Sequence, residues 1–312
     1  MPLPDEFLEL ARKVNNWGRW GSEDELGTIN LITDEVVRRA ASCVRIGKRF
    51  SLALPLSEDG PDLGNIPGRA GNPERKMLSI NLAISKNPDA MRSSDDAVSM
   101  PLQCATHWDA LAHVSYAGRL YNGFPISSVD ERGASRLGIA NIKTLVSRGV
   151  LLDVARTKGV DRLQGGYAIT PEDLDAAEKR TGVRVEAGDV ILIRTGSILW
   201  LNEGRKDSYS GIVEGIPGPG MACAQWFRER DIAAVATDNA GFEVWPLERK
   251  DLLFPVHLLD LVEIGLTQGQ NFDLEALAAD CADDNVYEFL LSASPEAFER
   301  GLGSPVNPVA IK

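Results

Sequence analysis

The fold is decided between residues 149 and 194, where two short apolar runs, Gly149-Val-Leu-Leu-Asp-Val154 and Asp189-Val-Ile-Leu-Ile-Arg194, enclose a predicted helix. Apolar runs of this length are typical of central strands that are buried on both faces. The helix is predicted over residues 173–181, because Thr170 can cap its first turn and Pro171 suits the first helical position. A strand, a helix and a second strand in this order are typical of α/β proteins.

Strand-like and helix-like segments alternate on both sides of this unit. Apolar residues at helical spacing predict helices, and short apolar or alternating runs predict strands. The helices are expected at residues 4–15, 34–44, 222–230 and 274–282, the buried strands at 232–236 and 287–292, and half-buried strands at 50–56 and 78–84. Residues 59–75 and 86–100 are polar and predict long loops. Buried and alternating strands together predict an α/β fold with a mixed sheet.

Composition and charge exclude several classes of protein. The 312 residues have 33 basic and 45 acidic side chains, a formal net charge of −12, which argues against a nucleic-acid partner. No apolar run reaches the 18 residues that a membrane-spanning helix needs, and the acidic N-terminus is unlike a signal peptide. The four cysteines are widely spaced and predict reduced core thiols. We therefore expect a soluble cytoplasmic protein.

Familiar catalytic motifs are absent from the sequence. There is no G-x-x-x-x-G-K-[ST] phosphate loop and no G-x-S-x-G serine hydrolase elbow. The Gly-rich stretch at residues 215–220 contains prolines where a dinucleotide-binding turn needs backbone N–H groups. A nucleotide-binding or serine-hydrolase function is therefore not indicated.

Histidine is concentrated in one segment. Only three histidines occur, and two of them lie in Gln103-Cys-Ala-Thr-His-Trp-Asp-Ala-Leu-Ala-His113, an H-x-D-x-x-x-H pattern. On an extended strand, His107 and Asp109 project to the same side, and a turn after Asp109 can bring His113 back to the same point. Two imidazoles and a carboxylate suit Zn²⁺ or Mn²⁺. From spacing alone, a hydrogen-bonded histidine pair without a metal remains an equal alternative.

This segment resembles the metal-binding motif of the cyclase family of metal-dependent hydrolases, whose members include bacterial kynurenine formamidase and isatin hydrolase. Further blocks of the sequence are similar to recurrent blocks of its longer members: residues 20–30, 148–153, 188–196 and 303–308. The resemblance implies a swivelling β/β/α fold over residues 1–312, with an N-terminal extension up to about residue 48. It also implies a divalent metal, a homo-oligomer, and hydrolysis of an amide, imide or lactone-type bond.

The resemblance also implies roles for single residues. His107 and Asp109 match metal ligands, His113 matches the histidine that acts as base or as a second-site ligand, and His257 matches a distant ligand. Two departures matter, because the family's first histidine is Gln103 here and its downstream glutamate falls on Gln270. With two amides in the ligand set, one metal ion is expected rather than two, and it can be weakly held or lost.

Two acidic residues offer a replacement for the missing carboxylate. Asp238 and Glu243 follow the predicted strand at residues 232–236, where a solvated turn is an equally good interpretation. For Trp108 and Tyr116 we weigh stacking on an aromatic substrate against a packing role, which is the commoner use of such residues.

The sequence thus predicts a hydrolase of a small substrate, in which His113 accepts a proton as metal-activated water attacks a carbonyl group. Loops 59–75 and 86–100 are expected to set specificity. Two alternatives remain on the same scaffold: a small-molecule binder without catalysis, and a metal-free lyase that uses His113.

Overall fold

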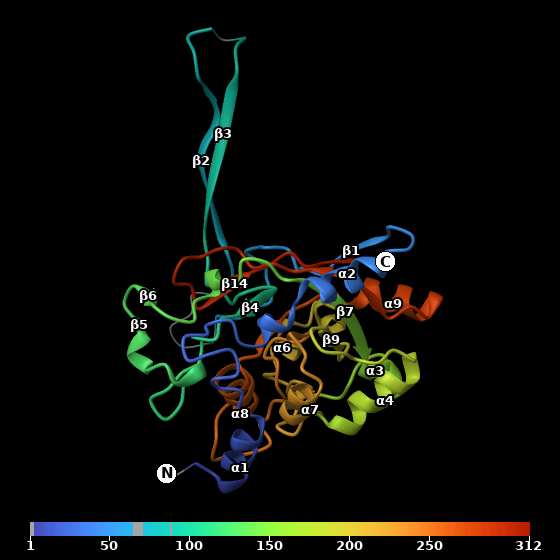
Figure 1. Cartoon of the computed structure of the whole chain (residues 1–312). Helices are drawn as coiled ribbons and strands as arrows, with labels where there is room; N and C mark the ends of the chain where they lie inside the picture. Colours follow the sequence, from blue (N-terminus) through green and yellow to red (C-terminus); the bar gives the residue numbers. More distant parts are fainter. Residues whose placement is uncertain (1–2, 65–70, 88) are drawn as a thin grey trace.

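The computed structural model describes residues 3–64, 71–87 and 89–312 (Figure 1). In this part of the chain, nine strands form one mixed sheet in the order β1-β15-β13-β7-β9-β11-β12-β4-β14. In that order their bounds are Arg49–Ser51, Val309–Ile311, Glu288–Ser292, Val146–Asp153, Val190–Arg194, Ala234–Thr237, Thr267–Gln270, His107–Asp109 and Gly303–Pro305. The mixed α/β architecture predicted from the sequence is confirmed.

The four strands β7, β9, β11 and β12 at the centre of the sheet are parallel. Antiparallel strands flank them on both sides, and β4 pairs with β12 on one side and β14 on the other. Alternate residues of the central strands enter two separate cores, because successive side chains of a strand point to opposite faces. Leu152 and Ile191 pack in one core, and Leu151 and Leu192 pack in the other.

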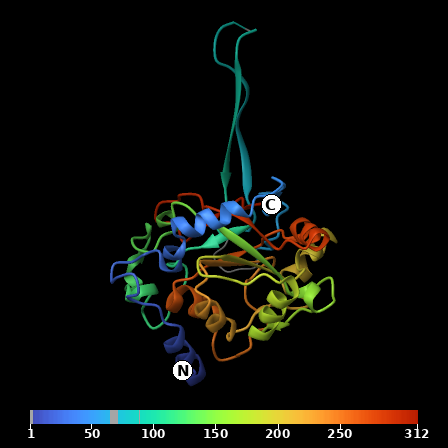
Figure 2. The same ribbon diagram turned by 45° about the vertical axis from the view of Figure 1, so that its right-hand side comes forward.

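Helices cover both faces of this sheet (Figures 1 and 2). The α-helices are α1 Asp5–Val14, α2 Asp34–Ser42, α3 Val154–Thr157, α4 Pro171–Thr181, α5 Ile198–Asn202, α6 Lys206–Tyr209, α7 Cys223–Glu229, α8 Pro255–His257 and α9 Glu275–Asp284. Short 3-10 helices are η1 Gly27–Leu31, η2 Tyr121–Gly123, η3 Ile126–Ser128 and η4 Ile139–Asn141, and η5 Leu258–Ile264 is a π-helix. None of the helices described is long and apolar enough to cross a membrane.

Helix α4 begins as the sequence predicts. Thr170 accepts a hydrogen bond from the backbone of Asp173, and the Asp173 side chain accepts one from the backbone of Thr170, which forms a capping box. The helix ends at Gly182, whose φ of 71° is unfavourable for other residues. The N-terminal helix also matches its prediction, because Phe7, Ala11 and Val14 of α1 are buried in the core.

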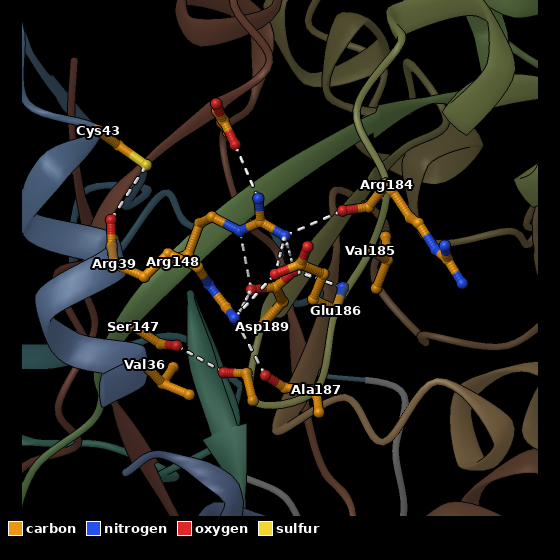
Figure 3. Close-up of polar contacts among 12 residues, drawn as sticks. Val36, Arg39, Cys43, Ser147, Arg148, Arg184, Val185, Glu186, Ala187 and Asp189 are labelled. Carbon is orange, nitrogen blue, oxygen red and sulfur yellow. Dashed lines mark hydrogen bonds and ion pairs between the residues drawn. The ribbon is translucent and has the colours of Figure 1, made fainter. Parts of the chain in front are cut away.

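A buried ionic cluster joins helix α2 to the sheet (Figure 3). The Arg148 guanidinium on β7 donates to both carboxylate oxygens of Asp189, at 2.9 and 2.6 Å, and to Glu288 on β13 at 2.8 Å. Arg39 of α2 donates to Asp189 from the other side at 2.9 Å. Asp189 is fully buried, so its charge depends on these partners.

Two predictions about residues 59–100 need correction. Residues 86–100 are not a loop, because Arg92–Ser99 form strand β3, which pairs with β2, Glu74–Ala83, in a long two-stranded ribbon. This ribbon projects away from the body beside β4 and β14 in both views (Figures 1 and 2). The strand predicted at 78–84 exists, but it is exposed rather than half-buried, because no other part of the described chain covers it. The predicted loop 59–75 includes residues 65–70, which lie outside the described residues.

Smaller two-stranded pairs complete the fold. They are β5 Val129–Asp130 with β6 Gly133–Ala134, and β8 Ala168–Ile169 with β10 Gly218–Pro219. The strand predicted at residues 50–56 is shorter than expected, since β1 ends at Ser51 and only a single bridge from Ala53 to Phe272 follows. All four cysteines are buried as free thiols, as the sequence predicts.

Candidate active site

Strand β4 places His107 and Asp109 on one face of the sheet and Trp108 on the other. In register, His107 lies opposite Gln270 of β12, and Asp109 lies opposite Gly303 of β14. Both side chains are almost completely buried, with exposed fractions of 1% and 0%. The extended geometry that the H-x-D spacing predicts is therefore confirmed, and the sheet holds the two groups rigidly.

His107 and Asp109 present two unpaired acceptor atoms to each other. The Nδ1 atom of His107 lies 2.6 Å from the carbonyl oxygen of Ala105, which can only accept, so Nδ1 is the protonated nitrogen. The Nε2 atom of His107 then has a lone pair, and it lies 3.5 Å from Oδ1 of Asp109. Neither atom has a hydrogen-bond partner. Two buried acceptors at this separation are satisfied by a positive charge, either a proton or a metal ion.

His113 approaches the same carboxylate oxygen. After β4 the chain turns, with a hydrogen bond from the backbone of His113 to the carbonyl of Ala110, and Nε2 of His113 lies 3.8 Å from Oδ1 of Asp109. About a quarter of the His113 side chain, 26%, is exposed, whereas Asp109 is fully enclosed. His113 is therefore the member of this group that a solvent molecule or a substrate can reach.

The second oxygen of Asp109 is held by two amides of β12. Nε2 of Gln270 donates to Oδ2 of Asp109 at 2.9 Å, and Nε2 of Gln268 approaches the same oxygen at 3.4 Å. Gln270 was predicted as a metal ligand, and it lies within this group with its amide nitrogen toward Asp109. Gln268 was not singled out from the sequence. Its role arises from its position two residues before Gln270, on the same face of the strand.

The histidines control the charge of Asp109. Burial by itself would raise the pKa of this carboxyl group, but His113, His107 and His257 lie near enough to lower the pKa well below its ordinary value. Asp109 is therefore ionised at neutral pH.

His257 is fixed by a buried carboxylate. Its Nδ1 donates to Glu243 at 2.5 Å, and Glu243 also accepts from the backbone N–H groups of Val256 and His257 at the start of α8. Burial opposes a charge on His257, but Glu243 and Asp109 raise its pKa above the ordinary value. A carboxylate behind an imidazole is the usual support of a metal-ligating or catalytic histidine.

The two acids offered as replacement ligands have other partners. Glu243 already accepts hydrogen bonds from the ring of His257 and from the start of α8. Asp238 accepts hydrogen bonds from the backbone of Thr195 and Gly196, at 2.8 and 2.7 Å, and from the hydroxyl of Thr195 at 2.6 Å. Asp238 therefore anchors the loop after β9.

The donor set fits a metal ion only in part. Donor atoms bound about 2.1 Å from one tetrahedral ion lie about 3.4 Å apart, close to the separation of His107 Nε2 and Asp109 Oδ1. However, within the described residues no group of three or more His, Cys, Asp and Glu side chains is arranged as a complete metal site. Gln103 lies nearby, since a Cβ at Gly303 would come within 2.5 Å of its amide nitrogen. Nε2 of His107 and Oδ1 of Asp109 are thus the two atoms that suit an ion. Amide or water oxygens would have to supply its remaining ligands.

Trp108 and Tyr116, for which the sequence leaves a choice between substrate stacking and packing, both have partners within the fold. Trp108 is fully buried: its indole donates to the carbonyl of Ala293 at 2.8 Å, and its ring packs edge-on against Phe272. Tyr116 is half-buried, and its hydroxyl bonds to Glu263 on η5. For both residues the observed contacts are packing contacts, which is the commoner of the two uses weighed from the sequence.

Two other aromatic side chains are exposed beside His257. The rings of Trp245 and Phe254 stack with centroids 6.3 Å apart, and the Phe254 ring meets the His257 ring edge-on at 5.4 Å. Both side chains are about 40% exposed, at 41% and 44%. Their position could not be derived from the sequence, although the dipeptide Phe254-Pro255, two residues before His257, is a local signal of a turn there.

An α/β protein in which an antiparallel strand and the following turn present two histidines and a carboxylate belongs to a recognisable class. The chain is a member of the cyclase family: the family model described as "Putative cyclase" matches residues 50–244. A comparison with curated proteins gave no match.

Solved structures agree with this membership. A crystal structure described as a novel cyclase is 38% identical, with a TM-score of 0.87, and the match covers 97% of this chain and 99% of the other. Isatin hydrolase A from Labrenzia aggregata is 21% identical, with a TM-score of 0.63 over 89% and 97% of the two chains. A potential metal-dependent hydrolase with cyclase activity is 16% identical, with a TM-score of 0.52 over 84% and 96%. These last two share the fold.

Proposed function

We propose that this chain is a hydrolase that opens an amide, imide or lactone-type bond of a small substrate, with one divalent ion, Zn²⁺ or Mn²⁺, at His107 and Asp109. The observation that supports this most directly is the pair of buried, unpaired acceptor atoms 3.5 Å apart, with the partly exposed His113 beside the same carboxylate. The hydrolases named among the structural neighbours support the same reaction class.

An ion at this position supplies Lewis-acid polarisation of a carbonyl group and lowers the pKa of water. The chain's own residues hold the side chains of the site in position. Gln270 and Gln268 hold Oδ2 of Asp109, so Oδ1 keeps its direction toward His107 and His113. Glu243 fixes the ring of His257 in the same way. The site is thereby organised before a substrate binds. This lowers the free energy that is needed to stabilise the charge that develops in the transition state.

His113 is the proposed proton acceptor. Its ring is the exposed member of the group, and Asp109, 3.8 Å away and ionised, stabilises the imidazolium that forms when His113 takes a proton from the attacking water. The same proton can then pass to the leaving nitrogen or oxygen. No other exposed imidazole in the described part of the chain lies beside Asp109.

The stacked pair Trp245 and Phe254 supports a planar substrate. Their rings lie beside His257 and expose apolar faces on which a ring of similar size can stack. A flat cyclic amide or imide therefore fits this environment better than a flexible chain does. The aromatic contacts are proposed here in place of those expected from Trp108.

The test is a chromatographic measurement of substrate loss and of the ring-opened product with a panel of cyclic imides, cyclic amides and lactones, with isatin included as one probe. We expect turnover by the wild-type chain and a loss of roughly 100-fold to 10,000-fold in His113→Ala, the range typical of a general acid–base group. Tyr116→Phe serves as the matched control, because Tyr116 lies close in sequence and the substitution keeps its ring, which packs edge-on against Phe7, and removes only the hydrogen bond from its hydroxyl to Glu263. Equal turnover in wild type and His113→Ala would contradict the role of His113. If neither protein hydrolyses any member of the panel but both bind one, the chain is a binder.

A further inference from the structure

Asn271 connects the end of β12 to the turn that leads into β4. It follows directly after β12, and its side-chain Nδ2 donates to the carbonyl oxygen of Ala105 at 3.2 Å. The same carbonyl oxygen lies 2.6 Å from Nδ1 of His107. The hydroxyl of Thr106, between these two residues, donates to the backbone carbonyl of Asn271 at 2.5 Å. The amide and the backbone of Asn271 thus both hold the turn before β4.

The amide of Asn271 has a fixed orientation. Its Oδ1 accepts a hydrogen bond from the hydroxyl of Tyr209, at the end of α6, at 2.7 Å. Because the Ala105 carbonyl can only accept, Nδ2 has to face it, and the Tyr209 hydroxyl has to donate to Oδ1. Burial raises the pKa of Tyr209 well above its ordinary value, so the hydroxyl keeps its proton. All three residues are buried, so bulk water does not compete for these hydrogen bonds.

Two neighbouring residues thereby support the two acceptor groups of the site. Gln270 donates to Oδ2 of Asp109 at 2.9 Å, and Asn271 donates to the carbonyl that His107 faces. Asn271 has a φ of 61°, a left-handed conformation that asparagine tolerates better than most residues do. Its backbone N–H donates to the carbonyl of Asn239, just after β11, at 2.9 Å. The backbone that carries the amide is therefore itself held in place.

The Ala105 carbonyl competes with Asp109 for the proton of His107. A neutral imidazole has one N–H group, and two acceptors lie near it: the Ala105 carbonyl at Nδ1, and the Asp109 carboxylate 3.5 Å from Nε2. An N–H group bonds more strongly to a carboxylate than to a carbonyl. Ala105 lies outside the paired positions of β4, so strand pairing does not orient its carbonyl. The amide of Asn271 supplies that orientation.

We propose that Asn271, held by Tyr209, is a positioning residue that keeps Nε2 of His107 unprotonated and directed at Asp109. This inference rests on the proposed function, because the lone pair on Nε2 is what a divalent ion at His107 and Asp109 would bind. Without the amide, the Ala105 carbonyl loses the Nδ2 donor and can turn away from His107. The ring then carries its proton on Nε2, bonds to Asp109 and closes the site to an ion.

The first readout is the position of the proton on the His107 ring in metal-free protein, by ¹⁵N NMR at about pH 9. The chain has only three histidines, so their ring signals can be separated, and His107→Gln identifies those of His107. In the wild type we expect a protonated Nδ1 and an unprotonated Nε2. Asn271→Gly removes the amide and accepts the φ of 61° without strain, and a large share of its molecules should have the proton on Nε2. Tyr209→Phe keeps the amide but frees its oxygen, and should give the same change to a smaller extent.

The second readout is the dissociation constant of Zn²⁺, measured by competition with a chelating dye. We expect it to increase roughly 10-fold to 100-fold in both variants, the usual effect of removing a group that supports a metal-binding histidine. Tyr121→Phe is the matched control, because Tyr121 is as deeply buried as Tyr209 and its hydroxyl bonds to Asp24 instead. It should change neither the dissociation constant nor the His107 signals. Thermal unfolding shows that each variant is folded, and if Asn271→Gly is not, Tyr209→Phe decides.

The two readouts separate a failure of this inference from a failure of the proposed function. Wild-type protein that binds neither Zn²⁺ nor Mn²⁺ would contradict the metal site, yet the ring signals would still decide the role of Asn271. Folded variants with the wild-type His107 signals would overturn that role, and so would a wild type in which Nε2 is protonated. Folded variants with the wild-type Zn²⁺ affinity would overturn it as well, while the proposed hydrolase would stand.

Discussion

At the scale of single residues, the site is marked by two buried acceptor atoms that have no hydrogen-bond donor. His107 Nε2 and Asp109 Oδ1 are buried, close together and without donors, although most buried polar atoms in proteins are paired. Gln270 could have donated to either oxygen of Asp109, but it bonds to Oδ2 and leaves Oδ1 directed at both histidines. This arrangement costs free energy of folding unless a positive charge lies between the two acceptors. Such unfavourable arrangements are typical of functional sites.

Asp238 provides a pH-dependent test at the same scale. Burial raises its pKa to about 6, although Thr195 and Arg194 act in the opposite direction. Between about pH 4 and pH 6 the folded chain therefore keeps a proton that the unfolded chain has lost. The free energy of unfolding should fall as the pH rises through this window and become level above it. The contribution of Asp238 is about 3 kcal/mol across the window.

Asp238→Asn removes this titration. Urea unfolding of both proteins from pH 4 to pH 7 should show that the wild type loses stability relative to the variant as the pH increases. The comparison of two proteins is needed because other carboxyl groups titrate in the same range. A difference in unfolding free energy that is constant from pH 4 to pH 7 would show that Asp238 has an ordinary pKa in the folded state.

At the scale of elements, the sequence predicts what is locally determined. The strands β7 and β9 follow from continuous apolar runs, and the start of helix α4 follows from Thr170 as the cap and Pro171 in the first turn. The H-x-D spacing likewise predicts that His107 and Asp109 share one face of an extended segment. In each of these cases the signal lies within a few residues, and the tertiary structure only has to agree with it.

Other elements depend on partners far away in the sequence. Arg92–Ser99 has no apolar alternation, and its extended form depends on pairing with β2. Strand β12, Thr267–Gln270, is polar in sequence yet fully buried, because Gln268 and Gln270 face the buried Asp109 rather than solvent. The pairing of His257 with Glu243 and the stacking of Trp245 on Phe254 join residues 9 to 14 positions apart without a regular pattern. Sequence periodicity contains no signal for such contacts.

The Arg148 cluster tests how helix α2 is held to the sheet. In Arg148→Met, Asp189 loses both hydrogen bonds from that guanidinium and keeps the one from Arg39, which should lower the free energy of unfolding by about 2–3 kcal/mol. Arg38→Met is the matched control, because Arg38 makes only an exposed pair with Glu35 on the same helix. Its urea midpoint should not change measurably. Equal midpoints for wild type and Arg148→Met would mean that the cluster adds no net stability.

At the scale of the whole molecule, the sheet separates two tasks. Its central parallel strands contribute to the two cores, and the added antiparallel strand β4 carries the catalytic candidates near one edge, at the base of the β2–β3 ribbon. Figure 2 shows this ribbon extending from the body.

The central claim is that His107 and Asp109 hold a divalent ion beside His113. Its most direct test is elemental mass spectrometry of the untagged protein, purified without chelator and dialysed against Zn²⁺ or Mn²⁺. We predict about one equivalent of metal in the wild type and in an Asp130→Ala control, whose substitution lies at the exposed end of β5, and almost none in His107→Ala. Wild-type protein that binds no metal under these conditions, or His107→Ala protein that binds as much as the wild type, would contradict the claim.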